Sequence, residues 1–328
     1  IDDSYNANPV SLRAALRAFA RWPAQGRKYL AIGPMLELGR LELPFASRIY
    51  WTNDAVKIGI ALENSFQQFD ARFLSLLAEL PQRVLDVSQD GTLAAISPDG
   101  QVLEIWDVNL GSLLLSQPLD FPFGGASFSP DGSRVMLPSM EEWAGVILST
   151  ADGSLQGEVT GFETAAPVYD VSYSPDGSQA VWIARATLQL SDLGSGTLSP
   201  EFNHMDFINS WALAPGRDLL VTATYGEVAG VFQPIIYLWN TVTGENNLKL
   251  TPGEIINGLD LDASGYLLAA GAPGHVLIYD LADASQITQL PIPDAETVTD
   301  LAFAPDGKTL AVLFPTETGT ILTLWGIP

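Results

Sequence analysis

The stretch VSYSPDG, residues 171–177, decides how this chain folds. Its first three residues are typical of a short β-strand, and Ser174-Pro175-Asp176-Gly177 then provides what a strand-reversing turn needs. Proline fixes φ, aspartate bonds its own backbone, and glycine adopts a positive φ at no steric cost. We therefore predict a strand that ends in a tight turn and is followed by a second, antiparallel strand.

The same turn recurs along the chain. Its glycine lies at positions 91, 132, 177, 216, 265 and 307, so the repeats are 39 to 49 residues long. After each turn comes a second apolar run, such as TLAAI at 92–96 or TLAVL at 309–313. The six turns are Ser88-Gln89-Asp90-Gly91, Ser129-Pro130-Asp131-Gly132, Ser174-Pro175-Asp176-Gly177, Ala214-Pro215-Gly216-Arg217, Ala263-Ser264-Gly265 and Ala304-Pro305-Asp306-Gly307.

A third run in each repeat often ends in an aromatic residue and a short one, as at IWD 105–107, LWN 238–240, IYD 278–280 and LWG 324–326. Three or four short strands per repeat, separated by such turns, form one antiparallel blade. These residues resemble the WD-repeat β-propeller family over about residues 73–328. The resemblance implies an all-β propeller of four-stranded antiparallel blades.

Six inner strands predict a six-bladed ring. The last repeat stops after its third strand at 320–325, and residues 75–80 read like the outer strands that precede other repeats. We therefore expect the strand at 75–80 to pair with 320–325 and to close the ring without an open edge. The alternative, a seventh blade drawn from residues 41–72, lacks a turn signature there. The apolar spacing favours a helical linker instead, on the residues Leu62, Phe66, Phe69, Phe73 and Leu76.

The first 40 residues read as a short α/β segment, in the order strand, helix, strand. DDSYNANP at 2–9, followed by MLELG at 35–39, resembles the opening of the C-terminal domain of the Mur ligases, and above all of the D-alanyl-D-alanine-adding ligases (MurF). The resemblance places Asp3, Asn6, Asn8 and Pro9 at a ligand-facing turn. The chain has no Gly-rich phosphate loop ending in Lys-Ser/Thr, so we expect this motif to be inactive, with no nucleotide binding. The predicted domains are thus 1–40, the linker 41–72 and the propeller 73–328.

Composition narrows the possible chemistry. The chain has 328 residues, 38 acidic and 15 basic, with no cysteine and two histidines, His204 and His275. Thiolate sites and multi-histidine metal sites are excluded, and we expect no cofactor and no metal. Residues 84–328 hold 30 of the acidic and five of the basic residues, a net of −25. This charge argues against nucleic acid and favours a partner protein with a basic surface.

The sequence favours a non-catalytic scaffold that binds or assembles proteins through an acidic, aromatic rim. Neither histidine lies near a nucleophile motif, and we assign no catalytic residue. Two alternatives remain: a propeller enzyme with a carboxylate-lined channel, acting on a sugar or a cationic substrate, and a ligase fragment fused to a propeller. No run is long enough to span a membrane, and the compartment stays open, because the propeller composition suits an extracytoplasmic setting and the N-terminal motif a cytoplasmic one. The candidate rim residues are Phe121, Phe123, Glu141, Glu142, Trp143, Phe162, Glu163, Asp206, Phe207, Tyr225 and Glu227, with Trp143 as the expected anchor.

Overall fold

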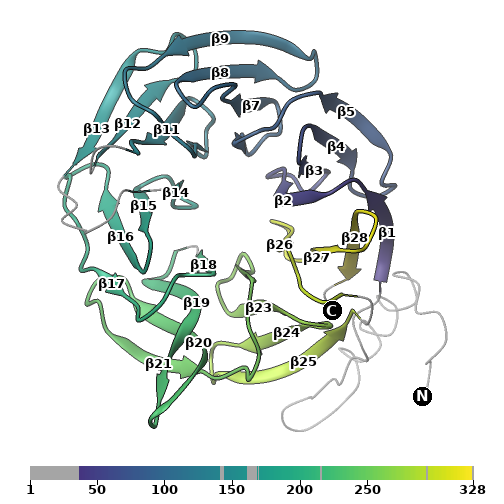
Figure 1. Cartoon of the computed structure of the whole chain (residues 1–328), viewed down its shortest axis with the longest axis vertical. Coiled ribbons are helices and arrows are strands. Elements are labelled where there is room, and N and C mark those ends of the chain that lie inside the picture. Colours follow the sequence, from purple (N-terminus) through teal and green to yellow (C-terminus); the bar gives the residue numbers. More distant parts are fainter. Residues whose placement is uncertain are drawn as a thin grey trace, which may run out of the picture.

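The computed structural model describes residues 37–140, 144–160, 168, 170–214, 216–292 and 295–326. These residues form seven four-stranded antiparallel sheets, and they contain no helix. The sheets are arranged as blades around a common axis (Figure 1), which in a propeller is the axis of a central channel. The described residues therefore contain no helix that could cross a membrane.

Each blade runs from an inner strand beside the channel to an outer strand at the perimeter. The first blade consists of β2 (Ala46–Trp51), β3 (Lys57–Leu62), β4 (Phe66–Asp70) and β5 (Leu76–Leu80). The second consists of β6 (Asp86–Val87), β7 (Leu93–Ile96), β8 (Val102–Asp107) and β9 (Ser112–Pro118), and the third of β10 (Ser127–Phe128), β11 (Arg134–Pro138), β12 (Ala144–Ser149) and β13 (Leu155–Thr160). The fourth consists of β14 (Asp170–Tyr173), β15 (Gln179–Ala184), β16 (Thr187–Asp192) and β17 (Phe202–Asn203).

The fifth blade consists of β18 (Ser210–Leu213), β19 (Leu219–Val228), β20 (Val231–Asn240) and β21 (Asn246–Leu250), and the sixth of β22 (Gly258–Leu261), β23 (Leu267–Ala272), β24 (His275–Asp280) and β25 (Ser285–Pro291). The seventh combines both ends of the described chain: β26 (Asp300–Phe303), β27 (Thr309–Pro315) and β28 (Thr320–Gly326) are completed by β1 (Glu37–Leu43).

An N-terminal strand closes the ring, as predicted, but the predicted strand at 75–80 is the wrong one. β1, not residues 75–80, pairs with β28, from Gly39 opposite Leu324 to Leu43 opposite Thr320. Residues 76–80 are β5, the outer strand of the first blade. Both segments have the apolar character of an outer strand, and only the pairing of the complete ring decides which one closes it.

The prediction of six blades is also wrong, because residues 46–80 form a seventh. The segment that we interpreted as a linker supplies β2, β3 and β4. No helix forms: the apolar residues of the expected stripe lie on β3, β4 and β5, except Phe73, which lies in the turn between β4 and β5. Its inner turn lacks the Pro-Asp-Gly signature and uses Thr52-Asn53-Asp54-Ala55, with Ala55 at φ 57°. Of the α/β segment expected over 1–40, residues 37–40 belong to β1, and residues 1–36 lie outside the described part.

The recurring aspartates form turns. In the third blade, Ser129 Oγ donates to Asp131 Oδ1 over 2.6 Å, and the Ser133 amide donates to the same oxygen over 3.0 Å. These donors, Ser129 first, lower the pKa of Asp131 to about 2. Gly132 follows at φ 70°. The turn chemistry predicted from the sequence is therefore present in the structure.

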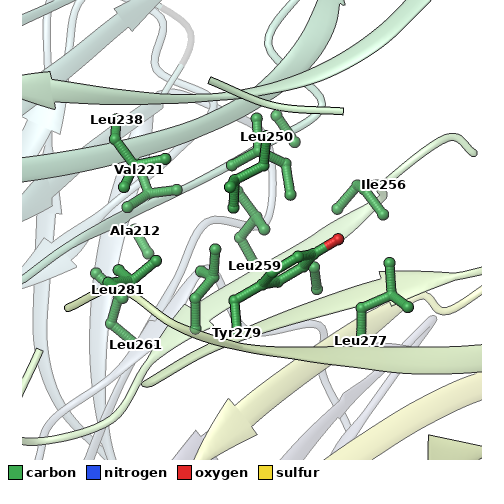
Figure 2. Close-up of a cluster of buried hydrophobic side chains, with 14 of the residues drawn as sticks. Ala212, Val221, Leu238, Leu250, Ile256, Leu259, Leu261, Leu277, Tyr279 and Leu281 are labelled. Carbon is green, nitrogen blue, oxygen red and sulfur yellow. The ribbon is translucent and has the colours of Figure 1, made fainter. Parts of the chain in front are cut away.

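The hydrophobic core lies between neighbouring blades rather than inside one sheet. Figure 2 shows the cluster between the fifth and sixth blades, where Val221 and Leu238 of one sheet face Leu259 and Tyr279 of the next. A similar cluster joins the seventh and first blades, with Leu322 and Leu324 among its members. Each blade thus buries its apolar faces against two neighbours, so its stability depends on a closed ring.

Candidate functional site

The fifth blade carries a hairpin that is longer than its counterparts. β19 and β20 pair over ten residues each, from Leu219 opposite Asn240 to Val228 opposite Val231. The next longest pair of second and third strands in the described residues, β27 with β28, spans seven. Ala229 and Gly230 join β19 and β20 at φ 53° and 80°, a two-residue turn that follows the twist of a hairpin. The additional pairs carry the tip of this hairpin beyond the rim.

Large apolar side chains gather at this hairpin and at the neighbouring loop. The Tyr225 and Phe232 rings stack, with centroids 5.5 Å apart and planes 17° apart. Phe232 is 56% exposed despite this stacking, and Phe207 is 53% exposed. Exposed aromatic rings held in place are typical of interface anchors. We call the large apolar side chains of this hairpin and loop the apolar rim cluster: Met205, Phe207, Tyr225, Val231 and Phe232. By strand alternation, Tyr225 and Phe232 lie on the hairpin face toward the sixth blade, and Val231 lies on the face toward the fourth.

Hydrogen bonds from β19 hold the loop that carries Phe207. Thr224 Oγ1 donates to the Phe207 carbonyl oxygen over 2.7 Å, and the Arg185 guanidinium lies 5.4 Å from the centre of the Phe207 ring. Arg185 sits at φ 55° in the turn between β15 and β16, so the fourth blade also supports this ring. Phe207 is therefore held from two blades.

A buried polar chain lies beneath the cluster. His204 Nε2 lies 2.7 Å from Thr222 Oγ1, and Trp239 Nε1 donates to the same hydroxyl over 2.9 Å. The other ring nitrogen of His204, Nδ1, lies 3.1 Å from the Ala186 carbonyl oxygen. Burial lowers the pKa of His204 to about 4, so the ring is neutral at neutral pH. This histidine stabilises the base of the hairpin.

The structure brings together some of the residues expected at the rim and separates others. Asp206, Phe207, Tyr225 and Glu227 meet at the fifth blade, with Glu227 exposed and opposite Phe232 in the hairpin. Phe121 and Phe123 instead pack against the core between the second and third blades, and Phe123 is 2% exposed. Outside the described residues lie Glu141, Glu142, Trp143, Phe162, Glu163 and the ligase-like Asp3, Asn6, Asn8 and Pro9.

Three members of the cluster, Met205, Val231 and Phe232, were not among the predicted residues. VFQPIIYLW, residues 231–239, reads as one apolar strand, and its first residues look as buried as its last. Pro234 was the available signal, because proline is uncommon inside a central strand and marks the point where the hairpin leaves the sheet.

The channel is the second candidate site, and three of its acidic side chains, Asp86, Asp260 and Asp300, link neighbouring blades. Asp300 Oδ2 accepts from the Ile49 amide over 2.8 Å, and Asp86 Oδ2 accepts from the Phe128 amide over 2.7 Å. Asp260, Ser127 and Ser210 accept in the same way from the next inner strand, at 2.7, 3.1 and 2.9 Å. Each bond fixes one inner strand to its neighbour around the ring.

The surroundings of these carboxyl groups change their protonation. Burial raises the pKa of Asp86 and Asp300 to about 6 and that of Asp260 to about 7, and it also raises the pKa of Asp170. Arg48 is the basic residue among them. The Tyr50 ring, followed by the aspartates across the channel, raises the pKa of the Arg48 guanidinium, which stays charged.

Three of these aspartates already make structural hydrogen bonds. A catalytic pair needs one carboxyl group that gives a proton and another that takes one from the substrate. Asp86, Asp260 and Asp300 already accept backbone hydrogen bonds between blades. In the described part of the chain, moreover, no three histidine, aspartate or glutamate side chains are grouped as a metal site needs. The channel residues therefore act first on the stability of the ring.

Comparisons with solved structures give the fold. A chain of the mitotic checkpoint complex superposes with a TM-score of 0.71 at 17% identity, covering 94% of this chain and 97% of that one. The Cps50 (Swd1) β-propeller domain of Myceliophteria thermophila superposes with a TM-score of 0.72 at 12% identity, covering 90% and 100%. The chain has the WD-repeat-like β-propeller fold. The propeller expected from the repeats is thereby confirmed, with seven blades in place of six.

Sequence comparisons add two partial matches. The small ribosomal subunit protein RACK1 of Medicago sativa is 25% identical over 139 residues, 38% of this chain and 40% of RACK1. The UDP-N-acetylmuramoyl-tripeptide–D-alanyl-D-alanine ligase of Bacillus subtilis is 47% identical over 45 residues, 14% of this chain and 10% of the ligase. The chain thus covers less than half of either relative. No family model matches it. The ligase-like character of the N-terminal segment rests on the short match alone.

Proposed function

We propose that this protein is a non-catalytic propeller scaffold that binds another protein through the apolar rim cluster of the fifth blade. The observation that carries the proposal is Phe232, which stays exposed while it stacks on the half-buried Tyr225 of a hairpin longer than its counterparts. Large exposed aromatic side chains cost little conformational entropy when they dock, because they are already held in place.

Charge indicates the kind of partner. The chain carries a net charge of −23, and the carboxylates of Asp206 and Glu227 belong to the same loop and hairpin as the cluster. An apolar surface surrounded by negative charge favours a partner with an apolar anchor and basic residues around it. Arg185, beside Phe207, is a positive charge at one side of the cluster and limits how the partner can be oriented.

The comparisons support the same function at the level of the fold. One similar chain belongs to a structure titled as the mitotic checkpoint complex, and RACK1 is named as a ribosomal subunit protein, so both names describe members of larger assemblies. The inter-blade hydrogen bonds of Asp86, Asp260 and Asp300 support a scaffold over an enzyme.

Site-specific crosslinking followed by measurement on the purified pair tests this proposal. A photoreactive phenylalanine derivative placed at Phe232 should capture a partner in the native cell extract, and the same group placed at Leu110, which is 77% exposed on a turn of the second blade, should not capture it. The captured protein is then purified and its affinity for the wild-type chain and for variants is measured.

We expect Phe232→Ala to weaken binding by about 2 kcal/mol, as for an interface anchor, mainly through faster dissociation. Leu110→Ala should leave the affinity unchanged. Added salt should slow association, because opposite charges steer the encounter. Equal affinities for the wild type and for a Phe207→Ala/Phe232→Ala variant that keeps its melting temperature contradict the assignment of this surface.

A further inference from the structure

A pocket lies where the first blade meets the loops that enter the second and third blades. Its volume is about 240 Å³. The residues that line it come from the first blade, from the loops that enter the second and third blades, and from β14 on another side of the channel. Seven of its eleven lining residues are small or apolar, but Arg48, Arg83, Asp170 and Tyr50 make the surface of the pocket mainly polar. The lining consists of Ser47, Arg48, Tyr50, Ala61, Arg83, Val84, Leu85, Gly124, Gly125, Ala126 and Asp170.

Two arginines, Arg48 and Arg83, line this pocket, and Arg48 also lies in the field of the channel aspartates Asp86, Asp170 and Asp300. The ion pairs within the described residues are His275 with Glu254 and Lys308 with Asp306, so neither Arg48 nor Arg83 takes part in one. Protein surrounds the Arg48 side chain, yet it remains exposed to the solvent of the channel, and the Arg83 side chain is exposed as well.

Asp170 provides the opposite charge on another wall. Unlike Asp86, Asp260 and Asp300, it accepts no hydrogen bond from the next inner strand in the described part of the chain. Among the described residues, its Oδ1 accepts from the amide of Val171, the residue that follows it, over 3.0 Å. The inter-blade bonding that explains the other channel aspartates therefore does not explain Asp170, and its carboxylate can bind a donor in the pocket.

We propose that this pocket binds a small zwitterion, an α-amino acid or a dipeptide, with its carboxylate toward Arg48 and Arg83 and its ammonium group toward Asp170. Guanidinium groups bind carboxylates through paired hydrogen bonds, and an ammonium group provides three donors to a carboxylate. The volume suits a ligand smaller than a drug-sized molecule. The small side chains Ala61 and Ala126 leave the walls open to a modest substituent.

Ligands with a single kind of charge fit this wall less well. A phosphate ion is attracted by the two arginines and repelled by Asp170, whereas a divalent cation is attracted by Asp170 and repelled by both arginines. A ligand that carries both charges a few bonds apart satisfies all three side chains.

Calorimetric titration of the full chain tests this proposal with defined probes. Glycine, alanine, glutamate and diglycine carry both charged groups, N-acetylglycine lacks the ammonium group, and glycinamide lacks the carboxylate. We expect at least one of the zwitterions to bind roughly tenfold or more tightly than both single-charge probes and than inorganic phosphate. No measurable binding of any zwitterion, or equal binding of the single-charge probes, overturns the proposal.

Variants locate the binding. Arg83→Met and Asp170→Asn should each weaken binding of the best zwitterion roughly tenfold or more. The matched controls Arg72→Met and Asp218→Asn change exposed residues elsewhere and should have no effect. Arg48→Met should abolish binding, but it also removes the positive charge among three aspartates and can unfold the protein. If it does, Arg83→Met is the variant that tests the site. Unchanged affinity in Arg83→Met overturns the site even if a zwitterion binds the protein.

Discussion

The first and second blades form the same inner turn from different sequences. In the second blade, Ser88 Oγ donates to Asp90 Oδ1 over 2.6 Å, and in the first blade Thr52 Oγ1 donates to Asp54 Oδ1 over the same distance. In both turns that carboxylate oxygen also accepts from the amide two residues further along, at 3.0 Å. A hydroxyl group and a carboxylate two residues later therefore define this turn, whereas proline is dispensable.

The two turns differ in the residue that follows the aspartate. Gly91 has φ 71° and Ala55 has φ 57°, so both adopt the left-handed conformation. A Cβ atom at Gly91 would lie 2.6 Å from Thr52 Cγ2 and 2.6 Å from Gln68 Nε2, both in the first blade. The second blade thus needs glycine partly because its turn packs closely against the turn before it. The glycine at this position is needed both for the positive φ and for the close packing of the neighbouring blade.

Removal of the closing strand should have the largest effect on stability, and the first blade should lose its structure before the second. In a variant that lacks residues 1–43, β28 loses its partner, and the core shared by the seventh and first blades loses Leu43. We expect strongly reduced stability and, by hydrogen exchange, earlier loss of protection in β2–β4 than in β7–β8. The matched control, a variant that lacks residues 1–36, keeps β1 and should retain its protection. Uniform loss across all blades contradicts the expected order.

Gly91→Ala should cost the second blade more than turn strain alone. The left-handed conformation costs an alanine about 1 kcal/mol, and the contacts of the new methyl group with Thr52 and Gln68 add about 1–3 kcal/mol. Gly111→Ala is the control, since Gly111 has φ 60° and open space around its Cβ direction. Denaturant unfolding of both variants gives the difference. Equal losses show that packing between the turns adds nothing.

Removal of the turn hydroxyl should affect the two blades equally. Thr52 and Ser88 are 4% and 3% exposed, and each hydroxyl donates to its aspartate and accepts a backbone amide, Lys57 or Leu93. Thr52→Val and Ser88→Ala should each lower the free energy of unfolding by about 1–2 kcal/mol. Thr52→Ser keeps the hydroxyl and should stay close to the wild type. A loss in Ser88→Ala without one in Thr52→Val refutes the equivalence of the turns.

The smallest expected difference between the two blades concerns the pH dependence of stability. It arises at the channel position two residues before each turn hydroxyl. This position holds Tyr50 in the first blade and Asp86 in the second, where burial raises the pKa of Asp86 to about 6. The folded state then binds more protons than the unfolded state between about pH 4 and pH 6, so stability falls as pH rises through that window. Asp260 and Asp300 act in the same direction, and His204, with its pKa lowered to about 4, acts in the opposite one.

We therefore expect a higher melting temperature near about pH 5 than near about pH 8. Asp86→Asn removes one titrating group and should make this dependence shallower. Tyr50→Phe, the matched change in the first blade, should leave it unaltered over this range, because the Tyr50 hydroxyl stays protonated throughout. A steeper dependence in Asp86→Asn contradicts the raised pKa.

Local chemistry made much of the fold predictable. The turns at Asp131 and Asp176 follow from contacts within five residues, and so do the strands on either side of them. The first blade was missed because Thr52 and Asp54 form the turn without proline or glycine. Its apolar residues also matched a helical spacing by coincidence: Phe66 and Phe69 are buried in β4, and Phe73 is 70% exposed in the turn that follows.

The candidate site was predictable only in part, for a similar reason. Phe207 and Tyr225 were expected at the rim and lie there, whereas Phe123 was expected there and is buried between blades. All three follow or interrupt apolar strands in the sequence. Their exposure depends on how far the adjacent loop or hairpin extends past the neighbouring blade, and a single repeat does not contain that information.

The sequence by itself determined the repeating unit: an inner strand, a hydroxyl–carboxylate turn and the strands that follow, because each turn is satisfied within a few residues. The tertiary structure decided the number of blades, the strand that closes the ring and the meeting of Arg48, Arg83 and Asp170 at one pocket. Closure pairs β1 with β28, almost the whole described chain apart, and an outer strand can be assigned only when every other edge is occupied. Channel residues, likewise, become neighbours only when the ring brings their inner strands around one axis.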